Sequence, residues 1–276
     1  MILFIFEGEI REPALYKTMK YLFLSSSIED DIIVSYCSNI YSLYKKMKEL
    51  DVFGDSADIV SVLQEQLKSS KNKHDELNKV KSSDSISEIY LFFDYDLKQK
   101  DNFNKLSVDE QNTQIKELLE YFNNETEKGK LYIDYPMVES IRYFKKELPD
   151  ENYINYETDM FVGKKFKEEA AKNSYYRNLR FITFDLNSKK EIKLPKNSNK
   201  IIDEEEIDKV KSNWNHVKDL NIKKANYICH GINEIPAIKD KINQLNIFNK
   251  QLSKYLIREK IAILNSFPLF LFEYLR

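Results

Sequence analysis

The feature that most constrains the fold is a short apolar run at the start of the chain that stops at an acidic turn. Residues 1–6 are Met-Ile-Leu-Phe-Ile-Phe, and Glu7-Gly8-Glu9 follows them. A continuous apolar run of this length, bounded by a turn, predicts a strand buried on both faces. A second such run, Ile89–Phe93, ends in Asp94-Tyr95-Asp96. Two buried strands that both end in carboxylates predict one acidic site at the edge of a sheet.

Alternating strand and helix patterns fill the first half of the chain. Further strands are predicted at 31–36, which is rich in β-branched residues, and at 130–133. Apolar residues at helical spacing predict helices over 14–24, 40–50 and 57–67, a helix capped by Ser107, and a helix with Pro136 at its first position. This order predicts an α/β fold with a mostly parallel sheet flanked by helices.

The pattern changes near Asp150, and we place a domain boundary there. The first region, residues 1–149, is predicted to carry the site, and the second, residues 150–276, is predicted to be mainly helical. Residues 150–200 show no regular period, whereas 207–220, 232–256 and a closing stretch to Tyr274 have helical patterns. The polar run 68–87 predicts a solvated helix flanked by loops.

Composition and charge limit the class of protein. Charged residues make up 32% of the chain and aromatic residues 13%, which excludes disordered and membrane-embedded proteins. A net charge of −2 gives no overall attraction to nucleic acid, so such binding needs a local patch. The N-terminal run lacks a basic flank and 267–272 is too short to span a bilayer, so we expect a cytoplasmic protein. Cys37 and Cys229 are predicted to be buried thiols without a disulfide or zinc site.

The carboxylates at the two strand ends suit a magnesium ion. Mg²⁺ prefers hard oxygen ligands on rigid elements and keeps several waters. We interpret Glu7, Asp94 and Asp96 as the primary candidate ligands, since Asp94 and Asp96 share one side of an extended segment. Glu9 and Glu12 are candidates for supporting these ligands or for binding a second ion.

These motifs together resemble a known domain. An apolar strand ending in Glu-Gly, then a helix, then a strand ending in Asp-x-Asp, is similar to the Toprim domain of topoisomerases, bacterial primases and nucleases of the overcoming-lysogenization-defect (OLD) type. The segment from Glu7 to Pro13 most resembles RloB-like and PARIS-effector (AriB-like) Toprim proteins of anti-phage defence. The resemblance covers about residues 1–145. A helical insertion at about 40–85 would account for the 86 residues between Glu7 and Asp94.

The resemblance implies an enzyme and a set of site residues. It implies a Toprim-type endonuclease, dependent on Mg²⁺ or Mn²⁺, that hydrolyses phosphodiester bonds of DNA or RNA, transfer RNA included, in antiviral defence. The chain has no GxxxxGK[ST] loop, so the resemblance also implies control by a separate ABC- or AAA-type ATPase, and it allows a homodimer. The catalytic metal ligands would be Glu7, Asp94, Asp96 and Glu139, with Glu12 as a further ligand and with Glu9 and Asp134 beside them.

A basic and aromatic segment is a candidate nucleic-acid interface. Residues 142–200 contain 14 Lys and Arg against 9 Asp and Glu. Cations attract phosphates and aromatic rings stack on bases, although a solvated basic face has the same composition. The candidate contacts are Lys164, Lys165, Arg177 and Arg180, together with Lys167, which follows Gly163 in the same run of lysines.

Two other classes of function remain open at this stage. One is a non-catalytic Toprim-like subunit that binds an ATPase and senses infection. The other is a different DxD metal enzyme such as a glycosyltransferase, because a strand followed by Asp-x-Asp also occurs there. The carboxylates could also be ordinary polar ends of strands and helices. Metal-dependent cleavage of nucleic acid, lost on replacing Glu7 or Asp94, distinguishes the nuclease from these alternatives.

Overall fold

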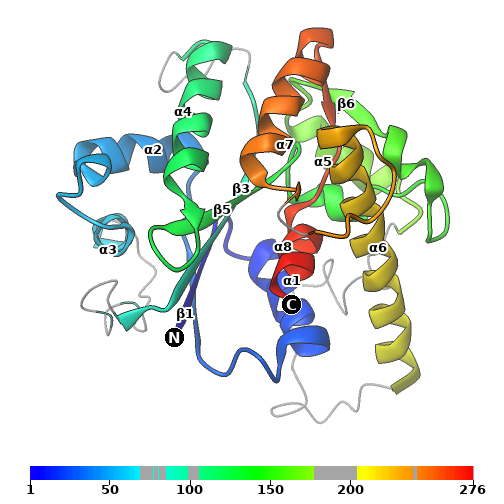
Figure 1. Cartoon of the computed structure of the whole chain (residues 1–276), viewed down its shortest axis with the longest axis horizontal. Coiled ribbons are helices and arrows are strands. Elements are labelled where there is room, and N and C mark those ends of the chain that lie inside the picture. The colour runs from blue at the N-terminus through cyan, green and yellow to red at the C-terminus, as the bar shows by residue number, and fades with distance from the viewer. Residues whose placement is uncertain are drawn as a thin grey trace.

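The computed structural model describes residues 1–68, 77, 80, 85–98, 106–176, 204–238 and 241–275. It is an α/β protein whose five-stranded sheet has the order β2-β1-β3-β5-β4 and is flanked by helices (Figure 1). Four strands run parallel and the short β4 is antiparallel at one edge. All four strands predicted from the sequence are confirmed. The strands are β1 (Ile2–Phe6), β2 (Asp31–Ser35), β3 (Glu88–Asp94), β4 (Asn123–Asn124) and β5 (Gly129–Asp134).

Strand β1 is buried along its whole length because it has strands on both sides and helices on both faces. Phe6 lies opposite Ser35 of β2 and Phe92 of β3. The pairing continues one residue further, since the Glu7 N–H donates to the Phe92 carbonyl (3.0 Å) and the Cys37 N–H donates to the Glu7 carbonyl (2.9 Å). An unbroken apolar run therefore suits this position, and the first carboxylate follows directly at the end of the strand.

Different helices cover the two faces of the sheet. Phe4 and Phe92 face Tyr16 of α1 and Phe267 of α8, with ring centroids 4.1 Å apart for Phe4–Tyr16 and 4.6 Å for Phe92–Phe267. Figure 1 shows α2, α3 and α4 on the other side of the sheet. Packed aromatic rings thus fix the sheet between two helical layers. These helices are α1 (Arg11–Met19, continued by a π-helix over Lys20–Leu24), α2 (Ile40–Glu49), α3 (Ile59–Lys68), α4 (Val108–Tyr121) and α8 (Ser266–Tyr274).

The C-terminal part is mainly helical, as predicted, but its elements differ in extent. Helix α6 is longer than predicted and ends at His230; Gly231 follows it with a φ of +77°, which suits glycine. The predicted helix over 232–256 is wrong at its start, because residues 231–238 form bends and turns. The pairing of β6 with β7 joins segments about 100 residues apart and was not predicted. The elements are α5 (Lys164–Lys172), α6 (Glu204–His230), α7 (Gln244–Lys250, continued by a π-helix over Gln251–Tyr255), β6 (Glu157–Asp159) and β7 (Lys260–Ala262).

The segment after β5 departs from the prediction. Pro136 does not begin a helix: a 3₁₀ helix spans Val138–Arg142, and Met137 before it is extended. Tyr135 pairs with Leu264 through two backbone hydrogen bonds of 2.8 and 3.0 Å. This pairing keeps the backbone extended past the end of β5 and delays the helix. The predicted helix within 68–87 falls almost entirely outside the described residues.

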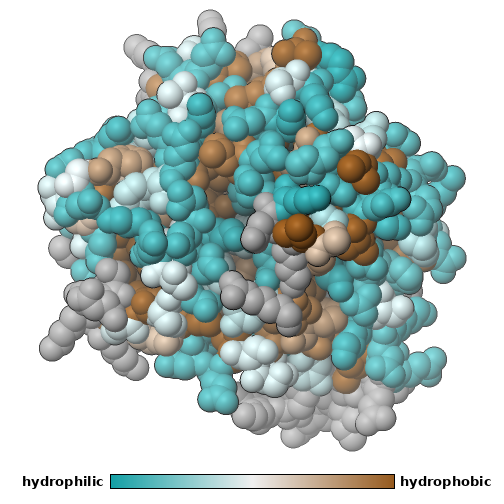
Figure 2. All heavy atoms as spheres, in the orientation of Figure 1, coloured by the Kyte–Doolittle hydropathy of each residue, from teal (hydrophilic) through white to brown (hydrophobic). Residues whose placement is uncertain are grey.

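The surface is mostly hydrophilic in the view of Figure 2, with apolar side chains in small separate groups. Within the described ranges, no helix has both the length and the apolar character needed to cross a bilayer. The domain boundary near Asp150 stays a prediction. Helix α8, which lies beyond that boundary, packs against β1 and β3 through the aromatic contacts described above.

Candidate functional site

A pocket of about 550 Å³ lies beyond the carboxyl ends of β1 and β3. On the strand side, its walls come from the turns after β1 and β2, the end of β3 and the start of α1. The opposite wall is formed by Val138 and Glu139 of the 3₁₀ helix and by Lys167 of α5. The strand order places β1 and β3 next to each other, as the prediction of a shared acidic site requires. Of the predicted site residues, the pocket brings together Glu7, Glu9, Glu12, Asp94 and Glu139.

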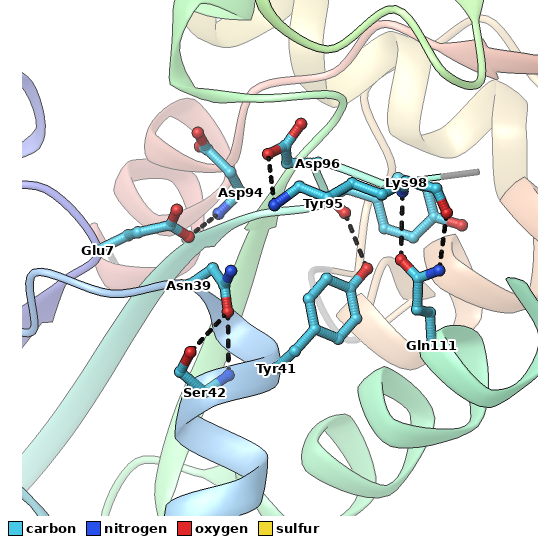
Figure 3. Close-up of polar contacts among 9 residues, drawn as sticks. All are labelled: Glu7, Asn39, Tyr41, Ser42, Asp94, Tyr95, Asp96, Lys98 and Gln111. Atoms are coloured by element: carbon cyan, nitrogen blue, oxygen red, sulfur yellow. Dashed lines mark hydrogen bonds and ion pairs between the residues drawn. The ribbon is translucent and has the colours of Figure 1, made fainter. Parts of the chain in front are cut away.

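Backbone hydrogen bonds hold two of these carboxylates in place. The Asp94 N–H donates to Oε2 of Glu7 at 3.0 Å, so the Glu7 side chain reaches across from β1 to the end of β3 (Figure 3). The Asp94 side chain in turn accepts the Val138 N–H at 2.8 Å through Oδ1. The two carboxylates are therefore fixed by the sheet and by the 3₁₀ helix, independently of any ligand.

Glu12 lies over Gly8 in the first turn of α1. Its side chain is only 7% exposed, and a Cβ at Gly8 would lie 2.7 Å from Glu12 Oε2. The absence of a side chain at Gly8 is thus what allows the carboxylate to sit there. Burial raises the pKa of Glu12, and backbone N–H groups together with Lys167 offset part of that rise.

Glu7, Glu12 and Asp94 form a cluster of negative charge that we call the acidic pocket. Burial raises the pKa of Glu7 to about 8, with Glu12 adding to the rise and the hydrogen bond from Asp94 opposing it. Burial also raises the pKa of Asp94 well above its usual range, and Glu7 and Glu12 raise it further. Among the described residues, no Lys or Arg forms an ion pair with any of the three. Such a cluster favours the binding of a cation.

The acidic pocket fits a divalent metal ion in its chemistry. Its donors are hard carboxylate oxygens on strand and helix ends, which Mg²⁺ and Mn²⁺ prefer. Within the described part of the chain, however, no three Asp, Glu, His or Cys side chains are already arranged around one metal position. Oε2 of Glu7 and Oδ1 of Asp94 are engaged by backbone N–H groups. Binding an ion would therefore require these carboxylates to turn towards each other.

Two predicted ligands, Asp96 and Asp134, do not line the pocket. Asp96 is one-third exposed and its Oδ2 lies 3.8 Å from Lys98 Nζ (Figure 3). Asp134 is 1% exposed and accepts the Ser266 N–H at 2.7 Å at the start of α8. Burial raises the pKa of Asp134 to about 7, and that hydrogen bond opposes the rise. Asp134 therefore contributes to the attachment of α8.

Glu139 lies in the pocket wall and contacts cations. It is 3% exposed, forms an ion pair with Arg11 of α1, and has Oε1 3.6 Å from Lys167 Nζ of α5. Arg11 and Lys167 also line the pocket; Arg11 was not predicted as a site residue, and Lys167 was predicted only as a phosphate contact apart from the carboxylates. Arg11 stands beside Glu12 in the acidic turn and Lys167 belongs to the run of lysines after Gly163, but neither pattern indicates which cation turns inwards.

Except for Lys167, the predicted nucleic-acid contacts lie apart from the pocket or outside the described residues. Lys164 and Lys165 are exposed at the start of α5 and do not line the pocket. Arg177 and Arg180 fall outside the described residues. The prediction that both cysteines are buried is correct for Cys229 and wrong for Cys37, which is exposed in the turn after β2. Burial and the hydrogen bond to Glu9 raise the pKa of the Cys37 thiol to about 12, so it is a poor nucleophile at neutral pH.

The fold and the pocket define a class of protein: an α/β protein with a mostly parallel five-stranded sheet and buried carboxylates at its carboxyl edge. No family model matches the chain, and neither curated proteins nor solved structures provide a match to it. The residues of the pocket are therefore the basis on which the function is inferred.

Proposed function

We propose that this protein is a metal-dependent phosphodiesterase of the Toprim type that hydrolyses nucleic acid. The observation that carries the proposal is the clustering of Glu7, Glu12 and Asp94, none of which forms an ion pair with a described Lys or Arg, beyond the ends of two adjacent parallel strands. The order of the motifs, Glu-Gly after the first strand and Asp-x-Asp after the third, supports the Toprim assignment. The position of the pocket at the carboxyl edge agrees with where α/β sheets bind ligands.

The residues of the pocket have separate roles in this proposal. Glu7, Glu12 and Asp94 would hold Mg²⁺ or Mn²⁺, with Asp96 and Glu139 as further candidates. A bound ion would supply Lewis-acid stabilisation of the charge that develops on the phosphoryl oxygens. The N–H groups of Asp94 and Val138 orient the carboxylates, and Gly8 leaves room for Glu12.

The biological setting follows from the resemblance. The proposal places the protein in the cytoplasm as an effector of anti-phage defence whose target is DNA or RNA, transfer RNA included. A separate ABC- or AAA-type ATPase would control it, because the chain has no nucleotide-binding loop of its own.

Metal-dependent cleavage tests the proposed reaction. The full chain, alone and together with a co-expressed ATPase from the same operon, is incubated with supercoiled plasmid and with total transfer RNA in Mg²⁺, Mn²⁺ or EDTA. We expect cleavage only with a divalent ion, and a loss of at least about 1000-fold in Glu7→Gln and Asp94→Asn. Glu120→Gln, an exposed carboxylate of α4, is the matched control and should cleave normally.

Three results would contradict the proposal. Cleavage that persists in Asp94→Asn would place the chemistry elsewhere. A wild-type protein that cleaves neither substrate with either ion, with or without the ATPase, would favour a non-catalytic binding subunit. Hydrolysis of a nucleotide sugar would favour a glycosyltransferase-like DxD enzyme.

A further inference from the structure

Two cationic side chains from separate segments contact Glu139, and a third cation contacts the backbone of one of them. Arg11, the first residue of α1, forms an ion pair with it. Lys167 of α5 has its Nζ 3.6 Å from Glu139 Oε1. Arg142, the last residue of the 3₁₀ helix that contains Glu139, donates from Nη2 to the Lys167 carbonyl at 3.5 Å. The cluster therefore joins α1, the 3₁₀ helix and α5 at one wall of the acidic pocket.

Arg142 is a buried cation without a counter-ion. Its side chain belongs to a residue that is 4% exposed, its Nε has no hydrogen-bond partner, and it forms no ion pair within the described residues. Burial lowers the pKa of Arg142 to about 10, and the nearby Arg11 adds to that effect. Because a buried guanidinium with open donors is costly unless it is paired, its position indicates a place for an anion.

The pocket contains cations as well as carboxylates. Arg11 and Lys167 both form ion pairs with Glu139. Arg11 and Lys167 line the same pocket as Glu12, and both lower the pKa of Glu12. The pocket is therefore bipolar, with carboxylates on the strand side and cations on the side of α5.

We propose that Arg11 and Lys167, with the charge of the buried Arg142 next to them, form an oxyanion site that binds a phosphate group of the substrate beside the acidic pocket. A guanidinium fork and an ammonium group that approach from two segments suit the several oxygens of a phosphate. Glu139 is their counter-ion when the phosphate is absent. This inference rests on the proposed function in one respect, since it names the part of the nucleic acid that the cations bind. It also makes Glu139 a positioning residue for the cations.

Phosphate binding in the absence of metal tests the site directly. Inorganic phosphate is titrated into the full chain in EDTA at fixed ionic strength, with calorimetry and melting temperature as readouts. We expect saturable binding that sulfate competes for and chloride does not. Lys167→Gln and Arg11→Gln should weaken binding about 10-fold each, since each removes a charge-assisted hydrogen bond. Lys172→Gln makes the same charge change at an exposed position of α5 and should change the affinity less than about 2-fold.

Glu139→Gln separates the two roles that this residue could have. If Glu139 is a counter-ion, the variant should bind phosphate about 3- to 10-fold more tightly, since a competing negative charge is removed, and should keep its Mn²⁺ affinity. Unchanged phosphate affinity with loss of Mn²⁺ binding would overturn the inference. Absence of phosphate binding in both wild type and Glu139→Gln would also overturn it, as would equal weakening by Lys167→Gln and Lys172→Gln. Phosphate binding without metal-dependent cleavage would uphold this site and refute the proposed reaction.

Discussion

Two regions of this molecule bury polar side chains at the ends of neighbouring strands, and they do so in different ways. Asp94 ends β3 and Asp134 ends β5, and the two residues are partners in the parallel register. Asp94 belongs to the acidic pocket, where its neighbours Glu7 and Glu12 are also negative. Asp134 belongs to a second region, which we call the helix junction, formed by Asp134, Asn221, Lys224 and Asn265.

The polar groups of the helix junction are matched by donors and acceptors. Asn221 Oδ1 accepts from the Tyr153 hydroxyl (2.8 Å) and from the Asn265 N–H (2.9 Å). Lys224 Nζ donates to two backbone carbonyls, at 2.9 and 2.6 Å. Asn265 donates to the Val138 carbonyl at 3.2 Å. These bonds connect α6 and α8 to the segment after β5, so this region stabilises the fold.

The acidic pocket has the opposite energetic character. Glu12 and Asp94 are also buried, and Glu7 is half-buried, yet these carboxyl groups face one another and raise one another's pKa. Charges arranged in this way destabilise the folded state unless a ligand compensates them. Polar residues buried at the same edge of the sheet therefore stabilise the fold at the helix junction and favour ligand binding in the acidic pocket.

The largest expected effect is on metal binding. Asp94→Asn should weaken Mn²⁺ binding at least about 100-fold, because it removes a carboxylate from the acidic pocket. Asp134→Asn makes the same change at the register partner and keeps an acceptor for the Ser266 N–H, so it should change Mn²⁺ affinity less than about 3-fold. Calorimetry with the full chain measures both. Equal losses in the two variants would remove the distinction between the regions.

The next largest effect is on stability, and it falls on the junction. Asn265 is fully buried, caps α8 through the Phe267 N–H and contacts Ser140 as well as Val138. Asn265→Ala should lower the free energy of unfolding by about 3 kcal/mol, since a cap and buried hydrogen bonds are lost together. Asn243→Ala removes only the exposed cap of α7 and should cost about 1 kcal/mol. Chemical denaturation compares them, and similar losses would contradict the special role of the junction.

The strands of the acidic pocket and all three of its carboxylates could be predicted from the sequence. Apolar and β-branched runs identify buried strands, and the carboxylates that follow β1 and β3 must meet because the strands are parallel neighbours. Glu12 was predicted from the same acidic turn. The periodic pattern of apolar residues was therefore sufficient where a candidate site residue directly follows the end of a strand.

The place of the cations in the pocket and the junction could not be predicted, because both depend on contacts between distant segments. Lys167 reaches Glu139 only because α5 packs beside the 3₁₀ helix, and Asn265 reaches Ser140 across 125 residues of sequence. Hydrophobic periodicity gives no information on such pairs. The backbone likewise stays extended past Pro136 because Tyr135 pairs with Leu264, which is also distant in sequence.

A smaller effect concerns pH and has a definite sign. The folded state raises the pKa of Glu7 from 4.5 to about 8, so it binds this proton more tightly than the unfolded chain does. Protonated Glu7 therefore contributes fully to the free energy of unfolding below pH 4.5, and this contribution is lost as the pH rises towards 8. Glu7→Gln should therefore be more stable than wild type in EDTA. The difference between their free energies of unfolding should increase by on the order of 1–2 kcal/mol between pH 5.5 and 7.5. Denaturation at several pH values measures it, and a constant difference would show that Glu7 is already ionised throughout.

The smallest effect tests the contact between Gly8 and Glu12 by means of a second glycine that is crowded in the same way. An added Cβ would lie 2.7 Å from Glu12 Oε2 at Gly8 and 2.6 Å from Asp51 Oδ1 at Gly54. Asp51 is exposed and accepts one exposed hydrogen bond, from the Ser56 hydroxyl, so it can turn into solvent at little cost. Glu12 is instead buried in the pocket wall. Gly8→Ala should cost about 1 kcal/mol of stability and weaken Mn²⁺ binding about 10-fold, because the Glu12 carboxylate is displaced. Gly54→Ala should change the free energy of unfolding by less than about 0.5 kcal/mol, since a restricted unfolded chain offsets the small rearrangement. If Gly8→Ala kept full Mn²⁺ affinity, Glu12 would not be a ligand, and the acidic pocket would be reduced to the two carboxylates at the ends of β1 and β3.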